Sequence, residues 1–173
     1  QLQEESGGLS ADNSGAENHC TVFTINESPI DKNIIWAGTD DGNVQVTTDG
    51  GKSWTNVTPN IKGVPKNTWA YYIEPSNFDI NTAYVVFDGH TQSDLKPYVM
   101  KTVDGGKTWK SVVNDQIPIY ARCIKEDPKN KNLLYLGTEF GLFVTVDGGQ
   151  NWAKFENNMP PVAVHYMAIQ QTE

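Results

Sequence analysis

Basic residues are scarce in this chain of 173 residues, which contains 13 Lys and Arg against 21 Asp and Glu and has a formal net charge of −8. Arg122 is the only arginine. Proteins that bind nucleic acids neutralise phosphates with a concentrated basic patch, and no segment of this sequence supplies one. We therefore expect no nucleic-acid partner.

Long apolar runs and clustered metal ligands are also missing. No stretch approaches the ~20 consecutive apolar residues that a membrane-spanning helix needs, so no membrane span is expected. The only cysteines, Cys20 and Cys123, match no metal-binding spacing. We expect two unlinked, buried thiols, with a disulfide between them as the alternative. The three histidines lie far apart, so no metal site and no cofactor are predicted.

What the chain does contain is one phrase in three copies. "TTDGGKSW" occupies residues 47–54, and the phrase returns as "TVDGGKTW" at 102–109 and as "TVDGGQNW" at 145–152. Each copy follows short runs rich in Val, Ile, Tyr and Trp that are separated by Gly, Asp and Asn, a pattern typical of strands joined by turns. Repeats of four short strands in roughly 40–50 residues indicate the blades of a β-propeller.

These repeats predict the domain organisation. The expected fold class is all-β: a partial β-propeller with about three four-stranded antiparallel blades and the first strand of a fourth. Open blade edges expose unpaired backbone groups, so we expect the remainder of the propeller, or other copies or fragments, to complete the ring. The predicted segments are an irregular N-terminal stretch (1–18), blade 1 (19–57), blade 2 (68–113), blade 3 (119–156) and the first strand of a further blade (163–173).

The repeated phrase is interpreted as a structural turn. Its glycines tolerate positive φ, its Asp can accept hydrogen bonds from backbone N–H groups, and its Trp can bury a large ring beneath the hairpin. One carboxylate per turn is too few for a calcium site, which takes about six to eight oxygen ligands. The residues assigned this structural role are Asp49, Trp54, Asp104, Trp109, Asp147 and Trp152.

The three phrases resemble Asp boxes, the Ser/Thr-x-Asp-x-Gly-x-Thr/Ser-Trp hairpins of BNR-repeat propellers. Sialidases, xyloglucanase-type glycoside hydrolases and sortilin-type (Vps10) domains share these hairpins. Phrases such as "WAGTDDGNVQVTTDGGKSW" and "LGTEFGLFVTVDGG" resemble most closely the exported bacterial sortilin-like proteins that are often labelled glycosyl hydrolases. The resemblance implies that the Asp boxes lie away from the ligand-binding face. It also implies a protein that is secreted, periplasmic or at the cell surface.

The turns between the second and third strands of each repeat are expected to form the ligand-binding face. Asp40, Asp88 and Glu139 occupy equivalent places in these turns. Glycoside hydrolysis requires paired carboxylates, although tight hairpins also favour Asp for structural reasons. Residues 39–42 are similar to a stretch that carries a catalytic Asp in xyloglucanase-type hydrolases, which makes Asp40 the catalytic candidate. The residues predicted to bind a ligand are Asp41, Asp88, His90, Glu139 and Trp69.

Three functions stay open at this point. The first is a binding or scaffold module for a protein, peptide or glycan. The second is a glycoside hydrolase that acts on a polysaccharide through Asp40 and a partner acid. The third is a structural subunit of a larger assembly. Sialidase chemistry is disfavoured, because that family holds the substrate carboxylate with several arginines and this chain has only Arg122.

Overall fold

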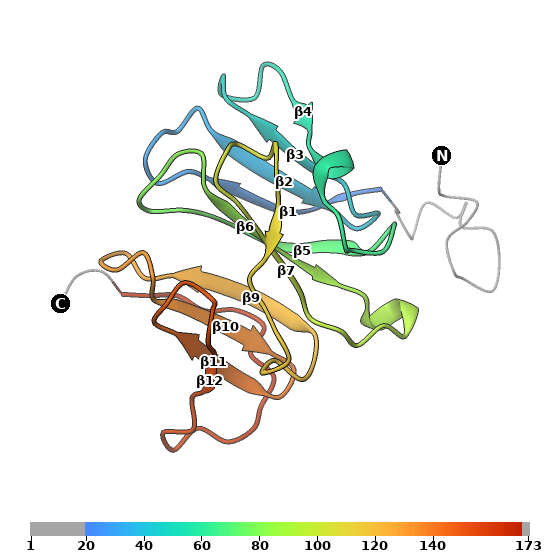
Figure 1. Ribbon diagram of the computed structural model, residues 1–173. Helices are drawn as coiled ribbons and strands as arrows, with labels where there is room; N and C mark the ends of the chain where they lie inside the picture. The colour runs from blue at the N-terminus through green and yellow to red at the C-terminus, as the bar shows by residue number, and fades with distance from the viewer. Residues whose placement is uncertain (1–19, 171–173) are drawn as a thin grey trace.

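Three antiparallel sheets make up the protein in the computed structural model, which describes residues 20–170 (Figure 1). Each sheet contains four strands, and neighbours in the sheet are neighbours along the chain. This arrangement confirms the all-β fold class and the partial propeller. The stretch 1–18, predicted to be irregular, lies outside the described residues. Within residues 20–170, no helix has the length and apolar character needed to span a membrane.

The strands succeed one another in a regular order. The first sheet consists of β1 (Val22–Glu27), β2 (Ile35–Thr39), β3 (Val44–Thr47) and β4 (Thr55–Asn56). The second sheet consists of β5 (Trp69–Pro75), β6 (Ala83–Asp88), β7 (Tyr98–Thr102) and β8 (Lys110–Ser111). The third sheet consists of β9 (Ala121–Glu126), β10 (Leu134–Thr138), β11 (Gly141–Thr145) and β12 (Ala153–Lys154). Two short 3-10 helices, η2 (Thr58–Asn60) and η3 (His90–Gln92), lie in connecting segments at the same side of Figure 1.

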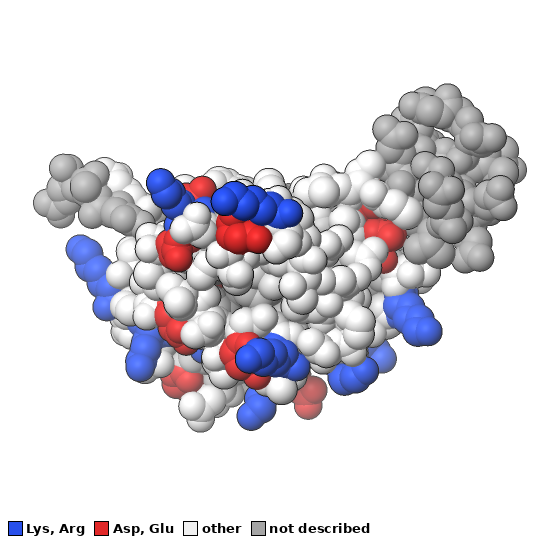
Figure 2. All heavy atoms as spheres, turned by 90° about the horizontal axis from the view of Figure 1, so that it is seen from above, with Lys and Arg blue, Asp and Glu red and all other residues white. Residues whose placement is uncertain are grey.

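The second sheet is sandwiched between the other two. Its strand β6 is buried at every position, because the first sheet covers one face and the third sheet covers the other. The sequence of this strand, "AYVVFD", lacks the alternation of polar and apolar residues that a half-exposed strand shows. Figure 2 shows acidic and basic side chains interspersed on one face of the molecule, with no continuous patch of one sign.

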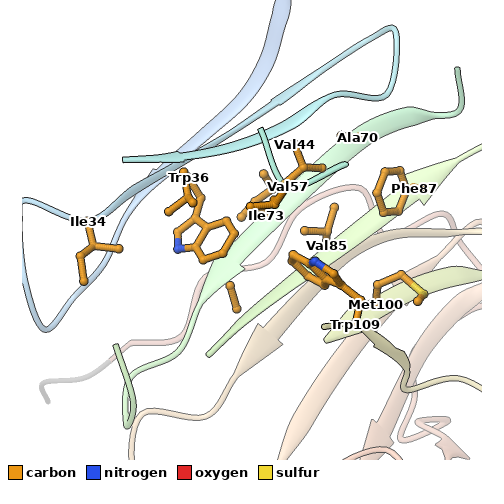
Figure 3. Close-up of a cluster of buried hydrophobic side chains, with 12 residues drawn as sticks. Ile34, Trp36, Val44, Val57, Ala70, Ile73, Val85, Phe87, Met100 and Trp109 are labelled. Carbon is orange, nitrogen blue, oxygen red and sulfur yellow. The ribbon is translucent and has the colours of Figure 1, made fainter. Parts of the chain in front are cut away.

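Aromatic side chains pack between the first two sheets (Figure 3). Trp36 of β2 meets the ring of Trp109 edge to face, with the ring centroids 6.0 Å apart and the planes at 86°. Pairs in this geometry contribute about 0.5–1.5 kcal/mol beyond the burial of their area. A second apolar cluster joins the second and third sheets, and its largest fully buried members are Tyr84, Val86, Ile124, Leu134 and Leu136.

Each Asp box closes the hairpin between the third and fourth strands of a sheet. In the second box, Asp104 Oδ1 accepts hydrogen bonds from the Thr102 hydroxyl at 2.9 Å and from the Thr108 N–H at 2.8 Å. The Gly106 N–H donates to the Thr102 hydroxyl at 2.9 Å, and Gly106 has a φ of +88°, which suits glycine. The polar groups of the phrase therefore bond mainly to one another and hold the turn.

The tryptophans of the three Asp boxes differ in burial. Trp109 is 9% exposed and Trp152 is 4% exposed, because the connection that follows the preceding sheet covers each ring. Trp152 Nε1, for example, donates to the Val112 carbonyl at 2.8 Å. Trp54 is 40% exposed, since it belongs to the first sheet, and among residues 20–170 no preceding sheet supplies a connection that could cover its ring. The prediction that every Asp-box Trp buries its ring is wrong for Trp54.

The predicted fourth-blade strand at 163–173 is not formed in its described part, residues 163–170. This segment lies against the third sheet, where the Val164 N–H donates to the Thr138 carbonyl at 2.9 Å and the Val164 carbonyl accepts from Cys123 Sγ at 3.5 Å. A strand requires a ladder of hydrogen bonds with a neighbouring strand, and no described residue supplies that neighbour.

The two cysteines are not joined by a disulfide, and they differ in burial. Cys123 lies in the core of the third sheet, where burial raises the pKa of its thiol to about 12. Cys20 is exposed, so the prediction of two buried thiols is wrong for this residue. The reason is its position ahead of β1, outside the packed sheets.

Candidate functional site

The innermost strand of each sheet contains a β-bulge at the same place. The pairing register shifts once along β1, once along β5 and once along β9, where these strands meet their neighbours. The residues left unpaired are Phe23, Tyr71 and Arg122. Because a bulge changes the direction in which a side chain points, the three equivalent bulges can gather side chains from three sheets.

The bulged residues lie in a row of contacting side chains with two neighbouring aromatic residues. Phe23 lies with its ring centroid 5.1 Å from that of Tyr71 and 5.3 Å from that of Trp69. The Arg122 guanidinium lies over two rings, 5.1 Å from the centroid of Tyr71 and 4.7 Å from that of Tyr120. We call these five residues the inner-strand wall. It includes Trp69, one of the residues predicted to bind a ligand.

Two acidic residues fix the guanidinium of Arg122. Nη1 donates to Asp88 Oδ2, while Nε and Nη2 both donate to Glu139 Oε2, at 3.3 and 3.2 Å. The side chain of Asp88 is fully buried and that of Arg122 is 8% exposed, whereas that of Glu139 is 30% exposed. Burial alone would lower the pKa of Arg122, but the charge of Asp88 raises it, so this arginine stays charged.

Histidines lie at both ends of this ion-pair network. His90 Nδ1 lies 2.8 Å from both carboxylate oxygens of Asp88, and the His90 ring stacks on Tyr120 with centroids 5.3 Å apart. At the other end, His165 Nε2 lies 3.9 Å from Glu139 Oε2. The structure thus brings together three of the predicted ligand-binding residues, Asp88, His90 and Glu139, through Arg122.

The predicted catalytic residue Asp40 is part of a different arrangement. Its carboxylate accepts a hydrogen bond from the Thr21 N–H at 2.8 Å and another from the Thr21 hydroxyl at 3.1 Å. Asp40 therefore links the segment before β1 to the end of β2, and the residue is 8% exposed. This geometry gives Asp40 a structural role that competes with the predicted catalytic one.

Asp41, predicted to bind a ligand, also lies apart from Arg122. Its carboxylate accepts hydrogen bonds from the Thr39 hydroxyl and from Asn43 Nδ2, the latter at 2.8 Å. Burial raises the pKa of Asp41, but these hydrogen bonds outweigh burial and leave the pKa below its ordinary value. Within residues 20–170, no group of three or more His, Cys, Asp or Glu side chains is arranged to hold a metal ion.

The residues predicted from the sequence to bind a ligand do not include Phe23, Tyr120 or Arg122. The signal was present in the repeats, because Phe23, Tyr71 and Arg122 occupy equivalent positions before the "I" that the three inner strands share. This equivalence did not predict a site, because a phenylalanine, a tyrosine and an arginine have no functional group common to all three. Their relation appears only when the bulges place them side by side.

Comparisons with known proteins agree with this architecture. A family model of the BNR/Asp-box repeat matches residues 45–56, which contain the first Asp box. The chain is a partial β-propeller with BNR/Asp-box repeats. A search of curated proteins gave no match.

Solved structures of two kinds resemble this partial propeller. An ancestral GH74 enzyme aligns with 82% of the chain at 22% identity and a TM-score of 0.61. The GH74 xyloglucanase from Xanthomonas campestris aligns with 79% at 19% identity and a TM-score of 0.63. YCF48 bound to D1 peptide aligns with 78% at 22% identity and a TM-score of 0.58.

These likenesses concern the fold. The partial propeller spans 19% of the ancestral GH74 enzyme, 21% of the Xanthomonas campestris enzyme and 40% of YCF48. The neighbours therefore include both glycoside hydrolases and a protein in complex with a peptide, and the fold is compatible with either function. The finer resemblance to sortilin-like proteins stays a prediction.

Proposed function

We propose that this partial propeller is a binding module and that its inner-strand wall binds a peptide. The observation that carries the proposal is the contact of Phe23 with both Trp69 and Tyr71, with Arg122 lying over the Tyr71 ring. Phe23 comes from the first sheet, Trp69 and Tyr71 come from the second, and Arg122 comes from the third. A ligand that lies along this wall would contact all three sheets.

The engagement of the acidic residues supports binding over catalysis. A glycosidase needs one carboxyl group that protonates the leaving group and a second that acts as base or nucleophile. Asp88 is buried and bonded to Arg122 and His90, while Asp40 is bonded to Thr21. Neither carboxylate is presented to a substrate in this arrangement.

The charge and chemistry of the wall favour a peptide with aromatic or basic side chains. Asp88 and Glu139 together carry two negative charges against the one positive charge of Arg122. A ligand cation is attracted both by this excess and by nearby aromatic faces. YCF48, a neighbour of similar fold, has been solved with a bound peptide, which adds support to this choice.

A peptide array, probed with the intact protein, tests the proposal. We expect binding to peptides rich in Arg, Lys and aromatic residues, and we expect the double variant Phe23→Ala/Trp69→Ala to lose most of it. Phe78→Ala is the matched control, because Phe78 is similarly exposed but lies outside the wall. Peptide binding that is equal in all three proteins, or no binding by any, would refute the assignment.

Carbohydrate binding is the second candidate, because the exposed ring of Phe23 and the half-buried ring of Trp69 can also stack on sugars. Xyloglucan oligosaccharides are the natural probe, since GH74 enzymes are among the structural neighbours. This candidate would be favoured if the oligosaccharides bind in a way that depends on Phe23 and Trp69 and no peptide on the array binds. Either ligand suits the expected location outside the cytoplasm, which stays a prediction.

We also propose that further blades complete the ring. The open face of the first sheet exposes the apolar residues Val22 and Ile25 at 61% and 62%, and it leaves Trp54 uncovered. The equivalent residue Trp109 is covered by the connection after the preceding sheet. Sedimentation analysis of the native protein provides the test: particles larger than 19.2 kDa are expected, and a stable monomer of that mass would contradict this part of the proposal.

A further inference from the structure

A groove between the first two sheets lies apart from the inner-strand wall. It has a volume of about 410 Å³ and is lined by the β2–β3 turn, by the connection from β4 to β5 and by Phe87 at the end of β6. The connection includes η2, which Figure 1 shows on the same side of the molecule as η3. The groove is thus lined by a turn between second and third strands, which the sequence predicts to bind ligands.

One wall of the groove is a chain of polar side chains. Asn43 Nδ2 donates to Asp41 Oδ2 at 2.8 Å, and Asn56 Nδ2 donates to Asn43 Oδ1 at 3.2 Å. The Asn56 side-chain oxygen accepts from the Thr58 N–H at 2.9 Å, which fixes that amide in turn. Each amide nitrogen carries a second N–H that these bonds do not use. The wall therefore offers oriented donors and a carboxylate, which suit the hydroxyl groups of a ligand.

Another part of the groove lining is apolar. Ile61 and Val64 line the groove while packing against the buried cluster between the first two sheets. Pro59 and Pro65 extend this surface on either side of them. A groove with one apolar wall and one polar wall fits a ligand whose own two faces differ in polarity. The ring of a pyranose has this property, because its axial C–H groups form an apolar face and its hydroxyl groups lie around the edge.

Two lysines at the groove give it a positive balance. Lys62 Nζ donates to the Pro59 carbonyl at 2.8 Å, which holds the ammonium group beside the groove, and Lys66 is exposed on the same connection. Against these stands one carboxylate, that of Asp41. The local charge is therefore opposite in sign to the net charge of −8 of the whole chain. Such a site selects a ligand that carries an anionic group.

We propose that this groove binds an acidic oligosaccharide whose sugar rings carry a carboxylate, as uronic acids do. The sugar hydroxyls bond to Asn43, Asn56 and Asp41, a ring face packs on Ile61 and Val64, and the carboxylate lies near Lys62 and Lys66. The site shares no residue with the inner-strand wall. The inference therefore goes beyond the proposed peptide binding and does not depend on it.

Calorimetric titration of the intact protein with two matched probes tests this site. The probes are an oligogalacturonate and the neutral galactose oligosaccharide of the same length. We expect the acidic probe to bind about tenfold more tightly, because two exposed ion pairs together contribute roughly 1.4 kcal/mol. This preference should shrink at high salt, since exposed charges are screened. Equal binding of both probes, or no binding of either, would refute the proposal.

Variants separate the charge contribution from the rest of the groove. Lys62→Gln/Lys66→Gln should abolish the preference for the acidic probe, whereas Asn56→Leu should weaken both probes. Lys107→Gln/Lys110→Gln removes the same charge from exposed positions outside the groove and serves as the control. An equal loss of binding in the control would show that only the overall charge matters, and would overturn the assignment of the site. Peptide binding at the inner-strand wall should stay unchanged in the first two variants.

Discussion

The guanidinium of Arg122 in β9 donates a hydrogen bond to the buried carboxylate of Asp88 in β6 and thereby joins the third sheet to the second. Removal of one member of such a pair leaves an uncompensated charge in the interior. We therefore predict that Arg122→Met lowers the free energy of unfolding by about 3 kcal/mol, as measured by urea denaturation.

The double variant Asp88→Asn/Arg122→Met distinguishes a buried charge from lost packing. It removes both charges, so much of the stability lost in Arg122→Met should return. If the double variant is as unstable as Arg122→Met, the loss comes from the arginine stem and its stacking on Tyr71 and Tyr120, and the prediction about charge is wrong.

The second prediction concerns two tryptophans at equivalent positions. Trp109 is 9% exposed and packs edge to face on Trp36, whereas Trp54 is 40% exposed. Trp109→Ala should cost about 3 kcal/mol or more in the free energy of unfolding, because it opens a cavity between two sheets. Trp54→Ala should cost much less in the dissociated 173-residue chain, where no further sheet among residues 20–170 covers the Trp54 ring. Equal losses in that chain would contradict the exposed position assigned to Trp54.

The third prediction uses the Asp-box carboxylates as pH probes. The hydrogen bonds from Thr108 lower the pKa of Asp104 from the ordinary 3.8 to about 2. Because the folded-state pKa lies below the unfolded one, the ionised Asp104 stabilises the protein above about pH 4, and this contribution is lost as the pH falls toward about 2. The melting temperature of wild-type protein should fall in this range more steeply than that of Asp104→Asn.

Circular dichroism melts between neutral pH and about pH 2 provide the measurement. The two proteins should differ most at neutral pH and converge as Asp104 becomes protonated. Asp115→Asn is the control, because Asp115 is an exposed aspartate outside the Asp boxes. A constant difference between wild type and Asp104→Asn across the whole range would contradict the assigned pKa.

The sequence predicts the strands and the Asp boxes of this fold well, because their determinants are local. In the second box, Thr102, Asp104 and Thr108 bond to one another within seven residues of chain, so the phrase carries its own structure. The order of short apolar runs then predicts three antiparallel sheets. Because the three repeats share one order of strands and turns, the strands of one blade can be located by alignment with those of another.

The candidate site was harder to predict because its contacts are distant in sequence. Arg122 and Asp88 lie 34 positions apart and belong to different sheets, and Asp40 finds its partner Thr21 at a separation of 19. Equivalent places in the repeats predicted a ring of similar carboxylates. Instead, Asp40 bonds to Thr21 in the segment before β1, while Asp88 and Glu139 share Arg122, since each turn meets a different neighbour.

The last prediction concerns Gly137 and the segment 163–170. A Cβ atom at Gly137 would collide with the Val164 carbonyl oxygen and would lie 2.7 Å from Cys123 Sγ and 2.9 Å from Val164 Cγ1, so that Gly137→Ala must displace its neighbours. Cys123 is buried in the sheet, whereas residues 163–170 belong to no strand, and the segment should therefore move. We expect the Val164 amide, which bonds to the Thr138 carbonyl at 2.9 Å, to lose its protection in hydrogen exchange while β10 and β11 keep theirs.

Gly38→Ala is the informative comparison, because its Cβ would lie 2.8 Å from Ala70 of β5, where a complete sheet resists displacement. That variant should lower global stability by about 1–3 kcal/mol. Unchanged protection of residues 163–170 in Gly137→Ala would show that this segment is held by more than its contact with β10.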